Sequence, residues 1–345
     1  MSRAWRYALV VCVFLTVSGA AAVVWLGIRS LDEPLRLAAP VRFKVVPGAS
    51  FARVAAELAA QGVIANPRAW VVYARLRGLA STVKAGEYEI QAGTTPRELL
   101  TKMVNGQVLL HSFTIVDGLR VQDMLDALRR NPDIVSTLAD KDPALMEKLG
   151  FPGTDPEGQF LPETYRFVSG TTDIELLRQA HAALSRELDA AWADRDPDLP
   201  LRTSYELLIM ASIIQKESGL PQELGKIAGL YLHRLSIGMR LQADPTVIYG
   251  LGDRYDGDIH STDLRTDGPY NTYTRAGLPP TPIALAGAAV IHATAHPEKT
   301  DAIYFVASPK DDGSHVFSST LQEHNTAVAS YVAHQRRKTA GTGVK

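Results

Sequence analysis

The sequence is poor in cysteine and has no excess of charge of either sign. Its only cysteine, Cys12, leaves no disulfide framework and no cysteine-based metal site. Lysine and arginine together number 36 against 37 aspartates and glutamates, so the net charge is −1. This balance offers no global electrostatic footprint for nucleic acid, and we expect no nucleic-acid partner. A neutral or weakly charged polymer is the easier partner to accommodate.

Several catalytic motifs are also missing. The sequence has no G-x-S-x-G elbow and no Walker A loop. His292 and His296 are spaced to share a metal ion, but the residues between them lack the glutamate of an H-E-x-x-H motif. We therefore expect neither a metal ion nor a cofactor. Carboxylate chemistry on a glycan remains as the reaction class.

Apolar residues are plentiful, and they begin with a long run near the N-terminus. An apolar fraction of 46% in 345 residues is enough for two or three domains with real cores. Residues 8–28 are uncharged and long enough to cross a bilayer as a helix. Arg3 and Arg6 precede this run, so the positive-inside rule places residues 1–7 in the cytoplasm and the rest of the chain outside. The alternative is a cleaved signal peptide ending near residues 19–22, and either interpretation exports the bulk of the protein.

A weak internal repeat follows a linker at residues 29–40. Segments beginning at Phe43, Tyr88 and Phe113 each contain an expected strand, a tight turn with glycine and an amphipathic helix. Ser50 or Thr94 can cap the helix that follows its turn.

The first two copies of the repeat, with an expected helix at residues 67–79 between them, form a βααβ-like unit. We assign this unit to residues 41–110. Its pattern resembles a LysM-like module, a fold that grips N-acetylated glycan chains. The alternative is a small structural α+β domain without a ligand.

The helix expected from Thr203 to Glu217 is the most informative stretch. Thr203 and Glu206 have the spacing of a capping box, and Ser218-Gly219 followed by Pro221 ends the helix. Glu217 shares one helix face with three apolar residues, which are Met210, Ile213 and Ile214.

That placement has a chemical consequence for Glu217. Desolvation and the negative end of the helix dipole both disfavour the ionised carboxylate, so we expect a raised pKa and a general acid. The alternative is a boundary residue with its head in water.

Other stretches give less specific predictions. Residues 131–150 are expected to be helical, and residues 336–345 to form a loose basic tail. Residues 156–167 mix aromatic residues with carboxylates, which fits a sugar-binding cleft or an ordinary packed loop. Residues 268–287 form a long irregular loop of the kind that is usually functional. Residues 246–249 fit either a buried strand or the start of a helix.

Four blocks in fixed order make the chain resemble a known family. They are ASIIQKESG, RLSIGMRLQADPTVIYG, PYNTYTRAGLPPTPI, and IYFVAS with HVFSSTLQEHN. In this order they resemble the endolytic murein transglycosylases, the YceG-like or MltG family. The resemblance covers nearly the whole chain and implies that Glu217 is the catalytic acid. The sequence departs from the family pattern at Gln215, where an acid is frequent, and in the proline loop at Thr281, Leu285 and Ala286.

The resemblance implies a complete domain plan. The expected fold is α+β, with an N-terminal transmembrane helix, the LysM-like subdomain and a larger mixed α+β catalytic domain at residues 111–335. It further implies a single-pass protein of the bacterial inner membrane with a periplasmic catalytic domain. The implied partners are peptidoglycan glycan strands and the inner-membrane peptidoglycan synthases.

The implied chemistry needs only one acid. Glu217 protonates the oxygen of the MurNAc-β-1,4-GlcNAc bond and then removes the C6 hydroxyl proton as that oxygen closes on C1, giving a 1,6-anhydro-MurNAc end. In this family the reaction is expected to terminate growing strands. We expect the following residues to line the cleft: Glu163, Gln242, Asp244, Tyr270, Asn271 and Tyr273.

Two other functions remain open at this stage. A hydrolytic muramidase would use Glu217 with Asp244 or Glu163 as its second carboxylate. A non-catalytic peptidoglycan-binding scaffold would use the LysM-like part to place wall-synthesis enzymes.

Overall fold

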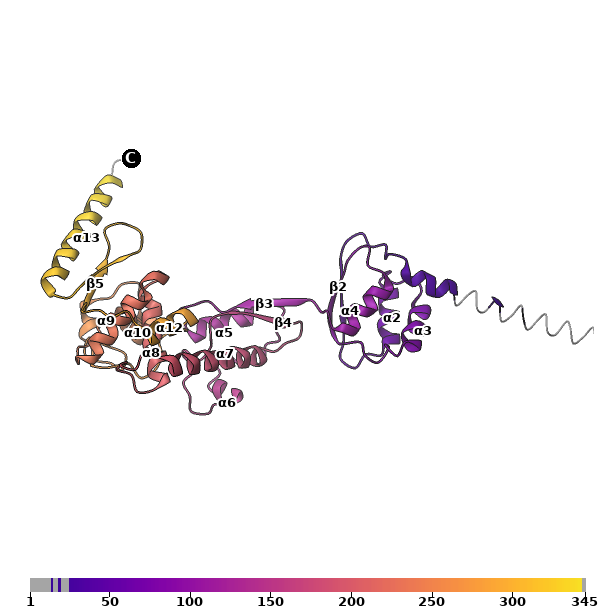
Figure 1. The fold of residues 1–345 in the computed structure, drawn as a ribbon, viewed down its shortest axis with the longest axis horizontal. Coiled ribbons are helices and arrows are strands. Elements are labelled where there is room, and N and C mark those ends of the chain that lie inside the picture. Colours follow the sequence, from indigo (N-terminus) through magenta and orange to yellow (C-terminus); the bar gives the residue numbers. More distant parts are fainter. Residues whose placement is uncertain (1–13, 15–17, 20–24, 343–345) are drawn as a thin grey trace, which may run out of the picture. The chain divides into compact units, whose positions relative to one another are not determined.

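The computed structural model describes residue 14, residues 18–19 and residues 25–342. Most of the expected membrane segment, residues 8–28, lies outside this part. Within the part that is described, no helix is both long enough and apolar enough to cross a membrane. The chain divides into two compact units (Figure 1). Unit 1 is Met1–His111 with Arg166–Gly170, and unit 2 is Ser112–Tyr165 with Thr171–Lys345.

Unit 1 has the βααβ order that the repeat predicts. Its two strands pair antiparallel, with Phe43 opposite Tyr88, and two helices lie between them in the chain. A third helix follows, and a single 3₁₀ turn precedes the first strand. The elements are η1 (Ser30–Asp32), β1 (Val41–Val45), α2 (Phe51–Ala60), α3 (Pro67–Leu76), β2 (Gly86–Ile90) and α4 (Pro96–Asn105).

Trp70 is at the centre of the core of unit 1. It is fully buried, its ring centroid lies 4.6 Å from that of Phe51, and its Nε1 donates to the carbonyl of Pro96 at 2.9 Å. The hydrogen bond satisfies the only polar atom of the indole, so the large ring is buried without an unpaired donor. This contact joins α3 to the start of α4.

The helix caps of unit 1 follow the sequence signals with one shift. Ser50 caps α2 by accepting from the backbone N of Arg53. Thr94 does not cap α4; Thr95 does, in a capping box with Glu98. The reason is that Pro96 occupies the first helical position, which makes the residue directly before it the cap.

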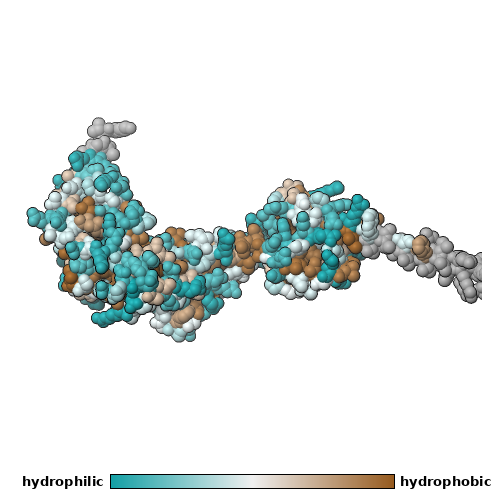
Figure 2. Space-filling view, viewed as in Figure 1, coloured by the Kyte–Doolittle hydropathy of each residue, from teal (hydrophilic) through white to brown (hydrophobic). Residues whose placement is uncertain are grey.

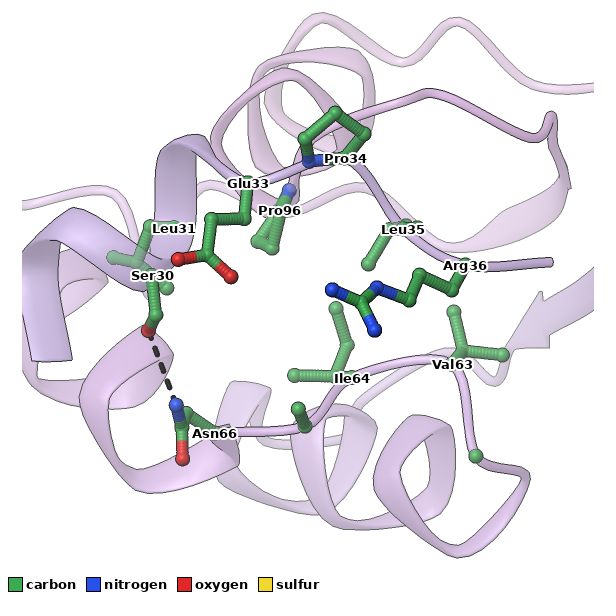
Figure 3. A pocket seen from close by; sticks show the side chains of 12 residues that line it. Ser30, Leu31, Glu33, Pro34, Leu35, Arg36, Val63, Ile64, Asn66 and Pro96 are labelled. Atoms are coloured by element: carbon green, nitrogen blue, oxygen red, sulfur yellow. Dashed lines mark hydrogen bonds between the residues drawn. The ribbon is translucent and has the colours of Figure 1, made fainter.

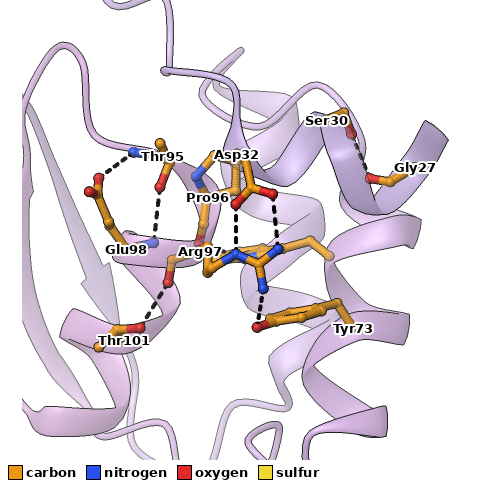
Figure 4. Close-up of polar contacts among 10 residues, drawn as sticks. Gly27, Ser30, Asp32, Tyr73, Thr95, Pro96, Arg97, Glu98 and Thr101 are labelled. Carbon is orange, nitrogen blue, oxygen red and sulfur yellow. Dashed lines mark hydrogen bonds and ion pairs between the residues drawn. The ribbon is translucent and has the colours of Figure 1, made fainter. Parts of the chain in front are cut away.

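Part of the expected linker packs on unit 1. Leu31 and Leu35 are buried in its core. Asp32 accepts two hydrogen bonds from the Arg97 guanidinium of α4, at 2.7 and 3.0 Å, and Figure 4 shows this guanidinium between Asp32 and Tyr73. Residues 31–35 therefore belong structurally to unit 1.

The third copy of the repeat starts in β3 (Leu110–Thr114) and ends in α5 (Val121–Arg130). The glycine turns of all three copies adopt the left-handed conformation, with φ of 79° at Gly48, 86° at Gly93 and 75° at Gly118. Residues with a Cβ rarely adopt this conformation, so the turns explain the recurring glycine. Strand β3 pairs with β4 (Thr164–Val168).

Unit 2 is mainly helical, with one hairpin of strands. Helices α7, α8, α9 and α12 pack on one another, and α10 also contacts α8. The hairpin pairs β5 with β6 antiparallel, and α13 packs on both strands. The elements are α6 (Leu145–Leu149), α7 (Asp173–Asp194), α8 (Ser204–Glu217), η2 (Pro221–Glu223), α9 (Leu224–Ser236), α10 (Asp244–Leu251), η3 (Gly252–Arg254), α11 (Ser261–Arg265), α12 (Ala288–Ala295), β5 (Tyr304–Ala307), β6 (His315–Ser318) and α13 (Leu321–Thr342).

Two secondary-structure predictions are wrong and one ambiguity is resolved. In residues 131–150 only Leu145–Leu149 is helical, because Pro132 and Pro143 break the stretch into turns. Residues 336–342 are not a loose tail, since α13 continues to Thr342, and residues 343–345 lie outside the described part. Residues 246–249 lie in helix α10 rather than in a strand.

The exposed apolar side chains of the surface do not mark a binding face. On the face shown in Figure 2, hydrophilic side chains cover most of both units. Large exposed apolar side chains are scattered over different elements, for example Leu76 on α3 and Ile237 after α9. Single exposed apolar residues are normal for soluble domains and mark no site by themselves.

Candidate active site

Helix α8 holds Glu217 at its C-terminal end. The Thr203 side chain caps the helix by accepting from the backbone N of Glu206 at 3.1 Å, while the Glu206 carboxylate accepts from the backbone N of Arg202 instead of completing the box on Thr203. Residues Leu207–Ile214 are all buried, so the helix is enclosed on nearly every side. The predicted helix is confirmed, and its enclosure fixes the position of Glu217.

The Glu217 carboxyl is in an environment that favours its neutral form. Burial raises the pKa of Glu217 to about 7, and the negative charge of Asp244 adds to the rise. A hydrogen bond from the Tyr231 hydroxyl to Oε1, at 2.6 Å, opposes it, as do the positive charges of His315 and Arg234. The expected rise in pKa is confirmed, and desolvation is its largest cause. The Glu217 residue is partly exposed, but its carboxyl group is bonded to the buried Tyr231 instead of being surrounded by water alone.

Arg234 is a second fixed group near Glu217. It lies one helical turn after Tyr231 on α9 and is only 6% exposed. Its guanidinium donates to the carbonyls of Ile303, at 2.6 Å, and Leu241. These bonds hold a permanent positive charge beside the acid, because an arginine stays protonated.

Asp244 and Tyr273 form a pair on another side of Glu217. The Tyr273 hydroxyl donates to Oδ1 of Asp244 at 2.5 Å. Burial raises the pKa of Tyr273, and the charges of Asp244 and Glu217 add to the rise, so both members of the pair are electrostatically coupled to the acid. Asp244 is exposed and lies at the start of α10. The structure thus brings together three of the residues that the sequence singles out.

The other expected cleft residues have different surroundings. Gln242 is exposed, and its φ of 51° is an uncommon left-handed conformation for a residue other than glycine. Tyr270 bonds to the Thr281 hydroxyl at 2.8 Å and packs on Tyr249. Glu163 is exposed beside β4, and its carbonyl accepts from Ile115.

Asn271 is a buried brace of the long loop. Its Nδ2 donates to three backbone carbonyls, of Asp263, Leu264 and Thr266, and its Oδ1 accepts from the backbone N of Tyr273. These bonds occupy the amide group, so Asn271 acts on the site by holding Tyr273 in place.

The aromatic residues of the loop at 156–167 are core residues. Phe160, Tyr165 and Phe167 are all buried, and the Tyr165 hydroxyl donates to the Leu161 carbonyl at 2.7 Å. The packed-loop interpretation is therefore confirmed for these rings.

Gln215 has a structural contact at the position where the family often carries an acid. Its Oε1 accepts from the backbone N of Gly287 at 3.0 Å. Leu285 and Ala286, which depart from the family pattern in the same loop, are fully buried. Gln215 thus ties α8 to the end of the proline loop.

Sequence reasoning missed a second buried acid, Glu157. Its Oε1 accepts from the backbone N of Val121 at 3.0 Å and its Oε2 accepts from the Tyr249 hydroxyl at 3.3 Å. Burial raises the pKa of Glu157 to about 7. The carboxyl takes the place of a cap at the start of α5, because Arg120 has no capping side-chain bond there.

Sequence reasoning also missed Tyr231, Arg234 and the partner of His315. Tyr231 and Arg234 share one face of the predicted helix after Gly219, and this was the only signal for them. His315 bonds to Glu223, which is 92 residues away. No pattern of spacing indicates such a pair.

The described residues contain no group of three or more histidine, cysteine, aspartate or glutamate side chains placed to hold a metal ion. His292 and His296 have ring centroids 4.6 Å apart, and His296 contacts Asp194 and Asp196. These two carboxylates give His296 a local structural partner.

Unit 1 has a separate pocket. Its lining includes the linker residues Glu33 and Arg36 and the loop residues Ile64 and Ala65. Figure 3 shows the Glu33 carboxylate and the Arg36 guanidinium directed into the pocket beside the apolar Ile64. Charged groups beside an apolar floor are suited to a polar ligand with apolar faces.

The Glu217 site has the features of a general acid–base centre, since one carboxyl group with a raised pKa lies among fixed polar partners. The particular family follows from the sequence profile of the YceG-like family, which matches residues 43–330. The chain belongs to this family.

Two relatives by sequence agree with this assignment. The chain is 30% identical to the endolytic murein transglycosylase of Bacillus subtilis (strain 168) over 330 residues, which cover 90% of each chain. It is 24% identical to the endolytic murein transglycosylase of Streptococcus pneumoniae serotype 2, covering 83% of this chain and 57% of that one. A crystal structure of a YceG-like protein from Listeria monocytogenes has 26% identity and a TM-score of 0.49, with 83% of this chain and 98% of that chain covered.

Proposed function

We propose that the protein is an endolytic lytic transglycosylase that cleaves the MurNAc-β-1,4-GlcNAc bond of peptidoglycan. The observation that carries the proposal is Glu217, a carboxyl group with a pKa of about 7 at the end of an enclosed helix. Family membership and the names of the relatives supply the substrate class.

The reaction uses Glu217 twice. The protonated acid gives its proton to the glycosidic oxygen as the bond from C1 breaks, and the GlcNAc end leaves as an alcohol. The Glu217 carboxylate then takes the proton from the C6 hydroxyl while that oxygen bonds to C1. The proton returns to Glu217, no water is consumed and a 1,6-anhydro-MurNAc end is formed. A pKa near 7 suits both halves, because the acid neither holds nor releases its proton too strongly.

The groups around Glu217 support both halves of this cycle. Tyr231 donates to Oε1 and keeps the carboxyl in one orientation. Asp244 and Tyr273 provide an acceptor and a hydroxyl on which sugar hydroxyls can bind. Gln242 precedes Asp244 in a strained conformation of the kind that gathers at functional sites.

Glu217→Gln tests the proposal directly. Purified sacculi are digested with wild-type protein and with the variant, and the released muropeptides are weighed. We expect anhydro ends from the wild type, lighter than reducing ends by one water, and at least ~1,000-fold less product from the variant, because the proton donor is gone. Glu147→Gln, an exposed acid of α6, is the matched control and should keep full activity. Full activity of the Glu217 variant would refute the assignment.

The same assay decides between the transglycosylase and a hydrolytic muramidase. Asp244 is the observation that favours the second candidate, since its charge acts on Glu217 and it is able to serve as a second carboxylate. Reducing ends that depend on both Glu217 and Asp244 would establish hydrolysis. If no product depends on Glu217, the non-catalytic scaffold function is the explanation that remains.

We also propose that unit 1 grips the glycan in the manner of a LysM-like module. Its βααβ order and the pocket beside Ile64 support this proposal. The proposed ligand is an N-acetylated glycan strand, whose apolar sugar faces suit the floor of the pocket.

The remaining proposals concern place and partners. Residues 8–28 anchor the protein in the bacterial inner membrane with the catalytic domain in the periplasm, where it acts beside peptidoglycan synthases and terminates strand growth. The apolar run and the preceding arginines support the anchor. Protease added to spheroplasts should digest the catalytic domain, and cross-linking in intact cells should recover a synthase.

A further inference from the structure

Glu223 and His315 form a mostly buried pair next to the Glu217 site. Glu223 closes η2 shortly after α8 ends, and His315 begins β6. Glu223 accepts twice from the same residue: Oε1 from the backbone N of His315 at 2.9 Å, and Oε2 from Nδ1 at 2.7 Å. The two side chains are only 9% and 15% exposed. A carboxylate with two donors from one residue fixes both the strand and the ring.

The pair is joined to the acid through packed rings. The contact with Glu223 assigns a proton to Nδ1 of the ring, and Nε2 faces away from Glu223 on the opposite side of the ring. The His315 ring meets Phe305 edge-on at 5.3 Å, and Phe305 meets Tyr231 at 6.0 Å. Tyr231 in turn donates to Glu217. His315 therefore lies at one end of a chain of packed rings whose other end, Tyr231, donates to the acid.

The charges around Glu217 show how His315 can act on the acid. Four other groups act on the acid: the Asp244 carboxylate, the Arg234 guanidinium and the hydroxyls of Tyr231 and Tyr273. The Arg234 charge is permanent and tied to two carbonyls. His315 supplies a second positive charge that acts on Glu217.

We propose that Glu223 and His315 are a positioning pair for the transglycosylase reaction, in which Glu223 fixes the ring and the cationic ring stabilises the Glu217 carboxylate that forms when the proton has left. The inference rests on the proposed function and deepens it. The pair takes no proton from the substrate; the proton still passes from Glu217 to the glycosidic oxygen and returns from the C6 hydroxyl. Without the cation, the Glu217 carboxylate would face Asp244 with Arg234 as its only nearby positive charge among the groups named above.

His315→Gln in the full-length protein tests the pair by its pH profile on sacculi. Wild-type activity should fall as the pH rises through about 7, because Glu217 loses the proton that it must donate. Removing a positive charge makes Glu217 hold its proton more strongly, so the midpoint of this fall should move up by about half a unit to one unit, with a maximal rate about tenfold lower.

Two further variants separate this role from a structural one. Glu223→Gln keeps the shape and an acceptor but removes the charge that holds the ring, and it should move the midpoint in the same direction. It also serves if the His315 variant fails to fold. His334→Gln is the control. His334 lies in α13 and is paired with Asp311, so its removal also breaks a bond between a histidine and a carboxylate, and it should leave the midpoint unchanged. A lower rate with an unmoved midpoint in both pair variants would show a purely structural role and overturn the proposal.

A titration without turnover keeps the inference distinct from the proposed function. The ¹³C-carboxyl resonance of Glu217 is identified by its loss in Glu217→Gln and followed with pH in wild type and His315→Gln. A shifted titration with no anhydro product from the wild type would sustain the pair and reject the transglycosylase. An unshifted titration with anhydro product would do the reverse.

Discussion

Two carboxyl groups in unit 2 have a pKa of about 7, and their partners differ in kind. Glu217 has a hydroxyl partner and lies among charged groups at the end of α8. Glu157 accepts from a backbone N–H and a tyrosine, and its bonds tie α5 and α10 to the loop between α6 and β4. The raised pKa of Glu157 therefore affects stability, whereas that of Glu217 also suits the acid–base role proposed for it.

Glu157→Gln should flatten the dependence of stability on pH. Because burial raises the pKa of Glu157 to about 7 from 4.5, the wild type loses stability as the pH rises between these values, by up to about 3 kcal/mol. The glutamine amide of the variant cannot ionise, so the variant loses none of this stability as the pH rises. Thermal unfolding at several pH values measures this; parallel curves for the variant and the wild type would contradict the prediction.

At the scale of elements, the features set by local signals could be predicted from the sequence, whereas those set by long-range contacts could not. The helix ending at Glu217 and the three glycine turns were predictable, because caps, breakers and periodicity act within a few residues. The shift of the cap to Thr95 is an error of one residue at a helix end. The bond between Glu223 and His315 was not predictable, since it depends on tertiary packing over 92 residues.

Asn271→Ala should destabilise the loop at 268–287. The substitution leaves three backbone carbonyls without their shared, buried donor, and we expect a loss of about 2 kcal/mol in the free energy of unfolding. Activity should fall as well, since Tyr273 loses its brace. Denaturant unfolding measures the loss, with Asn325→Ala on the exposed face of α13 as the control. Equal stabilities of the two variants would contradict it.

In the whole molecule, the Glu217 site and the pocket proposed to bind glycan lie on different units. Glu217 and all the groups that act on it belong to unit 2, whereas the pocket beside Ile64 belongs to unit 1. The division predicts that binding and cleavage can be impaired one at a time.

Ala65→Trp should fill the pocket of unit 1 and weaken retention on sacculi. The effect is best measured by sedimentation in a Glu217→Gln background, where no strand is cut, and we expect about tenfold weaker binding from loss of ~1.4 kcal/mol of contact energy. Ala52→Trp, on the exposed face of α2, is the control. Equal retention of both proteins would remove unit 1 from glycan binding.

Residues Arg166–Gly170 belong to unit 1 although more than fifty residues of unit 2 precede them in the chain. The Lys44 ammonium lies 3.3 Å from the Ser169 hydroxyl, and the Phe167 ring stacks on His111. During synthesis, unit 1 can therefore not be completed until residue 170 has left the ribosome, even though its own core is made by residue 111. A nascent chain arrested between these two points lacks the Ser169 contact of Lys44 and the Phe167 contact of His111.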